Sequence, residues 1–281
     1  MSTLPLFHGL FDGLFDDAAL FPPGNAAMPA ALTGHADYRR QWYSRLVAAF
    51  VCPAARLAEL DGVLAAAGSQ SMELSVTVPG GLPALAGALA MIDQHRRLAV
   101  RAVELPVPAA ELTGALEELG RTAQRGVEVF VEVRAAEVTS AASTALHQAR
   151  LGLKLRTGGT TAAAFPGVDA LAGAIETAVA AGVRFKCTAG LHHAVRHDDP
   201  ATGLTHHGFL NILLAVQAAQ NGSGETSELL ASRDGVELAE RARVLSPAEV
   251  GALRGQFASI GSCSILEPLT DLSSLKLVSA A

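Results

Sequence analysis

The sequence has little charge, few aromatic residues and almost no cysteine. Of its 281 residues only 17% are charged and 5% are aromatic, whereas 50% are hydrophobic. This balance excludes an intrinsically disordered chain, which combines low hydrophobicity with high net charge. The three cysteines, Cys52, Cys187 and Cys263, form no CxxC pair, so neither a disulfide framework nor a structural zinc knuckle is expected. We therefore expect reduced thiols in an intracellular, cytoplasmic protein.

Basic runs and long apolar runs are missing as well. The net charge is -6, and no cluster of Lys and Arg offers the surface that neutralises nucleic-acid phosphates. The N-terminus, "MSTLPLFHGLFDGLFDDAALFPP", lacks the basic start and unbroken apolar core of a signal peptide, and no stretch reaches the ~18 apolar residues of a membrane span. We expect neither a nucleic-acid partner nor a membrane partner.

What the sequence does contain is a repeated alternation of strand and helix. Ala/Leu-rich segments with helical spacing, such as "LPALAGALAMIDQHRR" and "VDALAGAIETAVAAG", separate apolar runs whose starts lie 24 to 32 residues apart. Such a pattern builds a parallel sheet, either open or closed into a barrel. The runs that we predict as strands are 46–51, 72–78, 101–107, 127–133, 151–157 and 183–188.

The side-chain alternation within these runs favours the barrel. In the run at 72–78, Leu74 and Val76 share one face, whereas Ser75 and Thr77 share the other. An open α/β sheet buries both faces under helices, so its strands tend to be apolar throughout. A barrel turns one face toward the helices and the other toward a common axis, where polar groups can converge. We predict an α/β protein with a (β/α)8 TIM-barrel fold.

The eighth strand is not evident from the pattern. After residue 188 the next convincing strand is "SIGSCSIL", which starts at 259, and the interval contains helical segments such as "FLNILLAVQAAQ". An unseen strand in that interval, the N-terminal "LFDDAALF" or the C-terminal "LKLVSA" could complete the ring, or the barrel could be incomplete. We expect one barrel domain over residues 1–281, with 1–44 as an N-terminal capping segment and 190–258 as a His-rich loop followed by a helical insertion.

The same alternation directs charged side chains toward the barrel axis. Buried charges must be paired, because an isolated ion in a low dielectric costs several kcal/mol, so an ion-pair network that fills the barrel is one explanation. The other is catalytic: a buried lysine beside other cations has a lowered pKa, which frees its amine to form a Schiff base. The residues that this side-chain alternation places on the axis are Thr77, Glu104, Glu128, Glu132, Arg134, Lys154, Arg156, Lys186 and Thr188.

Two of these strands carry a family resemblance. "LGLKLRTGGTTAAAFPGVDALAGAIETAVAAGVRFKCTAGL", preceded by "VEVFVEV", resembles the lysine strands of class I aldolases of the deoxyribose-phosphate aldolase type. The resemblance covers roughly residues 100–190. It implies that Lys154 is the Schiff-base lysine, that Lys186 lowers its pKa, and that Glu132 lies near them. Arg156 stands where that family has Ser or Thr, and "AGLHHAVRHDDPATGLTHH" replaces the family's glycine-rich phosphate loop.

Five of the nine histidines, His192, His193, His197, His206 and His207, lie close together after the last of the regularly spaced strands. They could act as general acids or bases, bind a metal together with Cys187 or Asp198, or simply face solvent. His193 and His197 would lie one turn apart if this segment were helical. In "SIGSCSILEP" no adjacent base is evident, so we expect Cys263 to be a small buried hydrophobe rather than a nucleophile.

Together these features predict a lyase, an aldolase-like barrel enzyme that acts on a small anionic carbonyl compound through an active-site lysine. We expect no cofactor and no metal, and the sequence leaves open a homo-oligomer. The alternatives are a metal-dependent hydrolase or lyase centred on the His192–His207 loop, and a non-catalytic binding protein. The predicted catalytic residues are Lys154, Lys186, Glu132, Glu104, His192 and His193. The predicted substrate-binding residues are Arg156, Gly158, Gly159, Thr160, Thr188 and Arg134.

Overall fold

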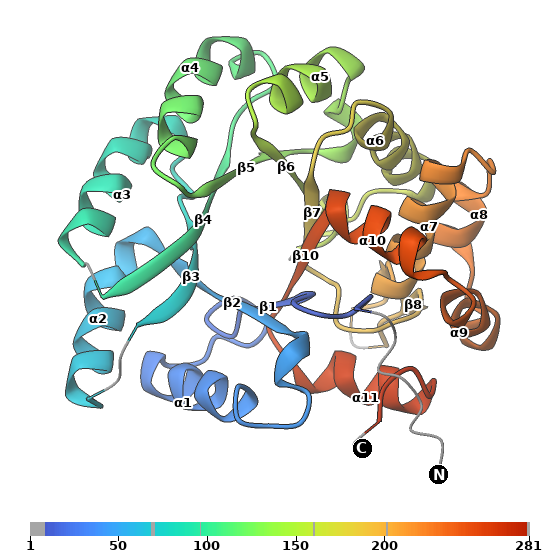
Figure 1. Cartoon of the computed structure of the whole chain (residues 1–281), viewed down its shortest axis with the longest axis horizontal. Helices are drawn as coiled ribbons and strands as arrows, with labels where there is room; N and C mark the ends of the chain where they lie inside the picture. The colour runs from blue at the N-terminus through green and yellow to red at the C-terminus, as the bar shows by residue number, and fades with distance from the viewer. Residues whose placement is uncertain (1–8, 69–70, 96, 160, 201, 280–281) are drawn as a thin grey trace.

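Eight parallel strands close into a barrel that helices surround, which confirms the predicted fold (Figure 1). The computed structural model describes residues 9–68, 71–95, 97–159, 161–200 and 202–279. Around the barrel the strand order is β1-β10-β7-β6-β5-β4-β3-β2. The strands are β1 (Phe15–Asp17), β2 (Val47–Pro53), β3 (Met72–Thr77), β4 (Leu98–Pro106), β5 (Glu128–Val133), β6 (Gly152–Arg156), β7 (Phe185–Thr188) and β10 (Phe257–Ser262).

The N-terminal "LFDDAALF" supplies the eighth strand. Within it β1 has only three residues, yet it pairs in parallel with both neighbours: Phe15 is in register with Ile260 of β10 and with Val47 of β2. One of the alternatives that the sequence left open is thereby confirmed. Residues 1–44 are therefore more than a cap, because they contribute a barrel strand and the helix α1 (Met28–Tyr38).

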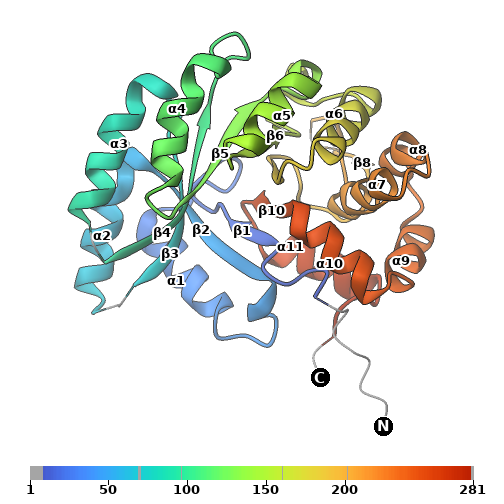
Figure 2. The same ribbon diagram turned by 45° about the horizontal axis from the view of Figure 1, so that its top comes forward.

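The helices cover the outside of the barrel, as the turned view in Figure 2 makes clear for α2, α3 and α4. The two helices expected from Ala/Leu spacing form at α3 and α6, and Gly182 follows α6 in a left-handed conformation that glycine adopts without strain. The helices between successive strands are α2 (Leu57–Ala66), α3 (Leu82–Gln94), α4 (Leu112–Ala123), α5 (Ser140–Gln148) and α6 (Val168–Ala180). The last, α11 (Leu266–Ser274), follows β10.

A long insertion lies between β7 and β10. It begins with a two-stranded antiparallel hairpin, β8 (His197–Asp198) and β9 (Thr205–His206). The buried side chain of Asn211 then ties the insertion together, because it accepts from the Arg196 backbone N–H and donates to two backbone carbonyls, including that of Leu229. The four helices of the insertion are α7 (Phe209–Asn221), α8 (Thr226–Ala231), α9 (Gly235–Arg243) and α10 (Pro247–Gln256).

One segment passes the length and composition test for a membrane span, contrary to the expectation that none would. It runs over Ala162–Ala180, with a mean hydropathy of 1.2. In the structure this segment is divided, and α6 takes up only its last 13 residues. At 1.5 Å per residue α6 is about 20 Å long, shorter than the ~30 Å hydrocarbon core of a bilayer. Its buried residues, which include Leu171 and Ile175, belong to the main hydrophobic core.

Candidate active site in the barrel

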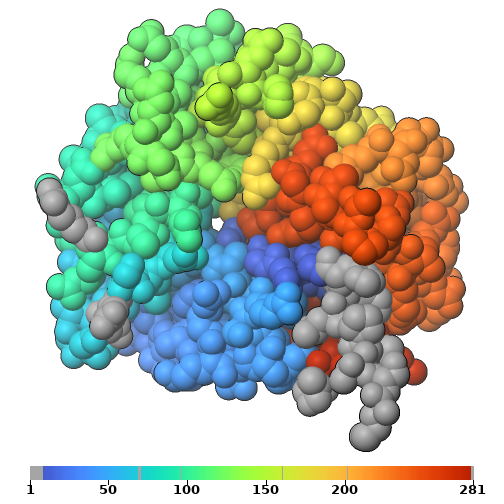
Figure 3. Space-filling model, in the orientation of Figure 1, coloured from blue at the N-terminus to red at the C-terminus, as the bar shows by residue number. Residues whose placement is uncertain are grey.

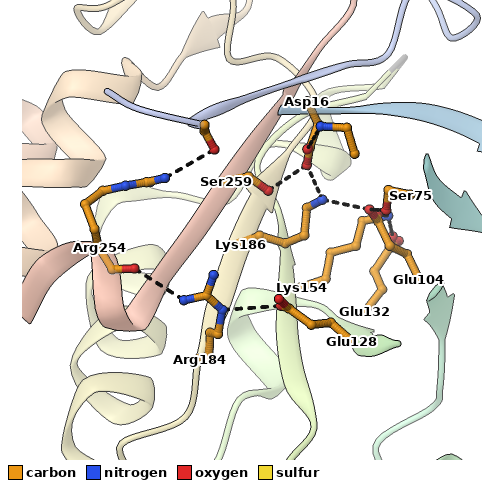
Figure 4. Close-up of polar contacts among 12 residues, drawn as sticks. Asp16, Ser75, Glu104, Glu128, Glu132, Lys154, Arg184, Lys186, Arg254 and Ser259 are labelled. Atoms are coloured by element: carbon orange, nitrogen blue, oxygen red, sulfur yellow. Dashed lines mark hydrogen bonds and ion pairs between the residues drawn. The ribbon is translucent and has the colours of Figure 1, made fainter. Parts of the chain in front are cut away.

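The centre of the barrel holds a continuous network of buried ion pairs (Figure 4). Lys186 of β7 is its most deeply buried cation, with a side chain only 2% exposed. Its Nζ lies 2.5 Å from Oδ2 of Asp16 and 2.7 Å from Oε1 of Glu104. Ser259 donates to the same oxygen of Asp16 at 2.6 Å, and Ser75 donates to Glu104. Each of these two buried carboxylates therefore meets an opposite charge and a hydroxyl, and Lys186 meets two opposite charges, as buried ions require.

Lys154 of β6 extends this network toward the C-terminal ends of the strands. Its Nζ lies 2.9 Å from Oε2 of Glu104 and 2.9 Å from Oε2 of Glu132. Glu104 is thus shared between the two lysines, one on each of its oxygens. Its side chain is 1% exposed, whereas that of Glu132 is 19% exposed. Lys154 therefore joins a fully buried carboxylate to one that solvent reaches.

The pKa shifts in this network contradict the expectation of a lowered lysine pKa. Burial alone would lower the pKa of Lys186, but Asp16 and Glu104 raise it above its ordinary value. Burial likewise opposes the charged form of Lys154, but Glu104 and Glu132 raise its pKa. The expectation was wrong because the charged groups in contact with each lysine are carboxylates rather than cations.

The carboxylate at the centre shifts in the opposite direction. Burial alone would raise the pKa of Glu104, but the combined attraction of Lys154 and Lys186 lowers it well below its ordinary range. Hydrogen bonds from Lys186 and Ser75 act in the same direction. Glu104 is therefore ionised at neutral pH, with both lysines protonated in the resting protein.

Lysine is rare in this chain, and most of it lies in the network. The sequence contains three lysines, Lys154, Lys186 and Lys276, among 21 Lys and Arg residues. Lys276 is exposed near the C-terminus, so two of the three are buried in the barrel. Arginine supplies nearly all other positive charge but cannot be deprotonated in a protein, whereas lysine can. Both buried positions are therefore occupied by lysine, the cationic side chain that can also become a free amine.

At the C-terminal mouth, Arg156 lies beside the network. Its Nη1 is 3.5 Å from Oε1 of Glu132, and its Nε donates to the carbonyl of Gly158. Arg134, which the side-chain alternation placed on the axis, instead points outward and pairs with Glu137. The side chain of Arg134 is 81% exposed. The strand has ended at residue 133, so the alternation no longer applies there. A cavity of about 220 Å³ lies here, lined by Pro106, Val107, Pro108, Glu132, Val133, Arg134, Glu137 and Arg156.

The glycines after β6 are explained by close packing with the loop after β7. A Cβ on Gly158 would lie 3.0 Å from the carbonyl oxygen of Ala189, and the Thr157 hydroxyl donates to that same carbonyl at 2.7 Å. Thr188 ends β7 in register with Arg156 and is partly exposed. Gly159 is similarly confined, with its Cβ position 2.7 Å from a neighbouring alanine methyl, and Thr160 lies outside the described residues. An anion-binding role for these residues stays a prediction.

A larger cavity, of about 630 Å³, opens at the other end of the barrel, where the strands begin. Figure 3 looks onto this face and shows a narrow opening near its centre. Glu128, which was expected on the axis, lies here and pairs with Arg184 at 3.3 Å. Two further ion pairs, Asp12 with Arg45 and Glu73 with Arg101, also line the cavity. Apart from Arg39, whose guanidinium donates to the carbonyl of Val47, its lining charges are paired with one another, and Lys186 lies on this side.

The histidine loop (residues 189–208) follows β7 and contacts α11. Glu267 and Asp271 lie one turn apart on α11 and pair with consecutive histidines, His192 at 2.9 Å and His193 at 3.1 Å. His197 lies in a hairpin strand rather than a helix, yet its ring meets that of His193 at a centroid distance of 4.5 Å. His206 stacks on His197, and His207 hydrogen-bonds a backbone carbonyl.

These histidines form a layer separate from the lysines. In the described residues, no hydrogen bond or ion pair joins them to Lys154 or Lys186, which lie within strands β6 and β7. Burial lowers the pKa of His192, His197 and His207, so their neutral forms are favoured. Within the described ranges, no three His, Cys, Asp or Glu side chains are grouped so that they could hold a metal ion. The geometry therefore does not support the metal-dependent alternative.

Comparison with known proteins finds no family for this chain. No protein-family model matches the sequence, and no curated protein matches it. Among solved structures, a variant of the carboxyl transferase domain of Rhizobium etli pyruvate carboxylase, with pyruvate, has a TM-score of 0.46 and 10% identity over 89% of this chain. A second structure of that domain has a TM-score of 0.41 and 17% identity over 82% of this chain. The chain spans 49% and 36% of their lengths, and likeness at this level does not bear on function.

Several members of the site were not among the predicted ones. Asp16 lies in a strand too short to show alternation, and Ser75 and Ser259 are small hydroxyl residues whose importance depends on their partners. Thr77, by contrast, was expected on the axis, and it lies in register with Glu104 with a buried hydroxyl that has no hydrogen-bond partner in the described structure. Only "FDDA", two acids in an otherwise apolar segment, offered a signal in the sequence.

Proposed function

We propose that this chain is a barrel enzyme that acts on a small anionic carbonyl compound at its C-terminal mouth, with aldolase-like lyase chemistry through Lys154. The observation that carries the proposal is the position of Lys154 between a buried carboxylate, Glu104, and a partly exposed one, Glu132, with Arg156 beside the latter. Barrel enzymes place their catalytic groups at this end of the strands. An amine, a proton acceptor and a cation that can bind an anionic group are thus adjacent.

Lys154, rather than Lys186, is the candidate amine. Lys186 is 2% exposed, is held between two buried carboxylates at 2.5 and 2.7 Å, and lines the cavity at the N-terminal ends of the strands rather than the C-terminal mouth. Lys154 is 9% exposed and contacts Glu132, which solvent reaches. Proton transfer from Lys154 to Glu132 converts a charged pair into a neutral one. A substrate that displaces water from the site favours this transfer. The charged pair of Lys154 and Glu132 then loses solvation, and burial disfavours the ammonium form of Lys154.

The reaction follows from these placements. An anionic group of the substrate binds Arg156, which is 49% exposed, and Lys154 transfers its proton to Glu132. The free amine then attacks the carbonyl carbon to give a carbinolamine. Glu132 returns the proton as the carbonyl oxygen leaves as water, which gives an iminium ion. The iminium ion accepts the electron pair of the adjacent carbon-carbon bond as that bond breaks, while the β-hydroxyl of the substrate loses its proton to Glu132 and departs as a carbonyl product. Protonation of the resulting enamine and hydrolysis by water release the second product and the free lysine. Lys186 remains charged and keeps Glu104 ionised between the two lysines.

Borohydride trapping tests this proposal directly. The protein is incubated with glyoxylate, pyruvate, acetaldehyde and glyceraldehyde 3-phosphate, reduced, and examined by intact mass and peptide mapping, with metal content measured on the same sample. We expect a reduced adduct on Lys154 with at least one anionic carbonyl compound. Lys154→Met should abolish the adduct, whereas Lys276→Met, the same change at the exposed lysine, should leave it intact.

Two results would contradict the proposal. Adducts equally distributed between Lys154 and Lys276 would indicate nonspecific amine chemistry. No adduct with any of the four compounds, in protein whose circular dichroism shows a folded barrel, would leave the buried charges with a structural role. Arg156→Met adds a further check, because it should weaken trapping of glyoxylate and pyruvate by at least tenfold while trapping of uncharged acetaldehyde changes little.

A further inference from the structure

A cysteine, a histidine and a glutamate meet at the C-terminal end of β10, apart from the lysine network. The Sγ of Cys263 lies 3.8 Å from both ring nitrogens of His192, and Nδ1 of His192 lies 2.9 Å from Oε2 of Glu267. A thiol, an imidazole and a carboxylate in this order are the parts of an activated nucleophile. The absence of an adjacent base in the sequence around Cys263 was misleading, since His192 lies 71 residues away along the chain.

The fold brings these three side chains together from neighbouring elements. Cys263 lies in the short turn between β10 and α11, where barrel enzymes carry catalytic groups. Glu267 lies in the first turn of α11, and His192 follows β7, which pairs with β10. The Cβ position of Gly24 is 3.2 Å from the Cβ of Cys263, so the N-terminal loop packs closely against the turn.

We propose that Cys263, His192 and Glu267 form a nucleophilic site for acyl compounds, in which Cys263 attacks, His192 accepts the thiol proton and Glu267 orients the imidazole. The sulfur is equally distant from both ring nitrogens, and with Nδ1 committed to Glu267, Nε2 is the nitrogen left to accept the thiol proton. The site uses none of the residues that the proposed lysine chemistry requires.

The electrostatic environment suits general-base activation. Burial raises the pKa of the Cys263 thiol, as do the charges of Glu267 and Asp17, whereas the backbone N–H groups of Gly24 and Cys263 lower it. Burial lowers the pKa of His192, and Glu267 partly offsets this effect. At neutral pH the resting pair is therefore a thiol and a neutral imidazole. The proton moves as the sulfur attacks, and the nearby N–H groups stabilise negative charge on the sulfur.

Cys263 differs in accessibility from the other cysteines. Cys52 and Cys187 are both 0% exposed, and burial raises the pKa of Cys52 to about 12. Cys263 is partly exposed. Acylation of a cysteine in the folded protein is therefore expected at this position, and peptide mapping distinguishes the three thiols.

The probe is p-nitrophenyl acetate. The sulfur of Cys263 forms a bond to the acetyl carbon, the carbon-oxygen bond to the leaving group breaks, and p-nitrophenolate departs. The thiol proton passes to Nε2 of His192 and from there to solvent, so no further reactant is needed. The product is an acetyl thioester on Cys263, measured as a burst of p-nitrophenolate and as one acetyl group added to the protein mass.

We expect acetylation of Cys263 in the wild-type protein and none at that position in Cys263→Ala. His192→Gln should slow it by about 100-fold or more, which is the usual contribution of a general base. The matched control is His95→Gln, which removes a histidine that pairs with Asp61 at 2.9 Å elsewhere in the chain and should leave the rate unchanged. Cys263→Ala should also leave any borohydride adduct on Lys154 intact, so this proposal and the previous one fail independently.

Glu267→Gln tests the positioning role through the pH profile. In the wild-type protein the acetylation rate should rise through the pKa of His192, below its ordinary 6.5. Without the Glu267 carboxylate, whose charge raises the His192 pKa, this rise should shift to lower pH, and the plateau rate should fall. Equal rates in wild type and in folded His192→Gln, or acetylation no faster than that of a small free thiol, would show that Cys263 is an ordinary partly buried cysteine.

Discussion

Replacing Lys186 with methionine should strongly destabilise the barrel. The change keeps a long unbranched side chain but removes an ammonium that lies 2.5 Å from Asp16 and 2.7 Å from Glu104. Glu104 keeps Lys154 as a partner, whereas Asp16 keeps, among the described residues, only two neutral hydrogen-bond donors, the Ser259 hydroxyl and the Ala49 backbone N–H. Removing one partner of a buried ion pair costs about 3–5 kcal/mol. A typical domain is stable by only about 5–15 kcal/mol, so the loss should be large.

Urea denaturation followed by circular dichroism measures this loss as a change in the free energy of unfolding. The control is Lys276→Met, the same substitution at the exposed lysine, which should change stability by no more than about 0.5 kcal/mol. Adding Asp16→Asn to Lys186→Met removes the stranded charge and should recover part of the loss. A cost below about 1 kcal/mol for Lys186→Met, or a double variant as unstable as the two single changes added together, would refute the reasoning.

Further predictions concern the pH dependence of the network and the packing of the barrel interior. Because the pKa of Glu104 is lowered, its contribution to stability is full above its ordinary pKa of 4.5 and is lost as the pH falls. Because the pKa of Lys186 is raised, its contribution to stability is full below its ordinary pKa of 10.5 and is lost as the pH rises beyond it. The stability difference between wild type and Lys186→Met should therefore be nearly constant from about pH 5 to pH 10 and shrink outside that range, as pH-dependent urea melts would show; a maximum at pH 3 would contradict it. Gly152→Ala should lower the free energy of unfolding by about 1–3 kcal/mol, because the new Cβ would lie 2.5 Å from the Phe130 ring. Gly62→Ala, at an exposed helical position with nothing within 4 Å of its Cβ position, should raise it by about 0.5–1 kcal/mol. Equal melting temperatures for the two variants would contradict this packing.

Local pattern was enough to predict most of the barrel strands. In β3 and β6 the alternation of apolar and polar residues follows from the two-residue period of a strand, which does not depend on neighbouring strands. Because the polar face of each run had to point somewhere other than toward the helices, the alternation also predicted a closed barrel. Strand β1 could not be predicted in this way, because three residues cannot show a two-residue period. Its pairing depends on Val47 and Ile260, both distant in sequence.

The candidate site was predicted less completely. The side-chain alternation identified four residues that do meet in the barrel: Lys154, Lys186, Glu104 and Glu132. The pKa shift of the lysines was predicted with the wrong sign, because a pKa depends on which charge is nearest in space.

Within the strands that the pattern reveals, the sequence alone determined which side chains face the barrel axis, because the direction of a side chain in a strand is a local property of the backbone. Only the tertiary structure decided which of those side chains touch. Asp16 and Lys186 are 170 residues apart, and His192 and Cys263 are 71 apart, so their contacts exist only once the ring has closed. Closure sets the distances between charges, and those distances determine which groups are ionised and which can react.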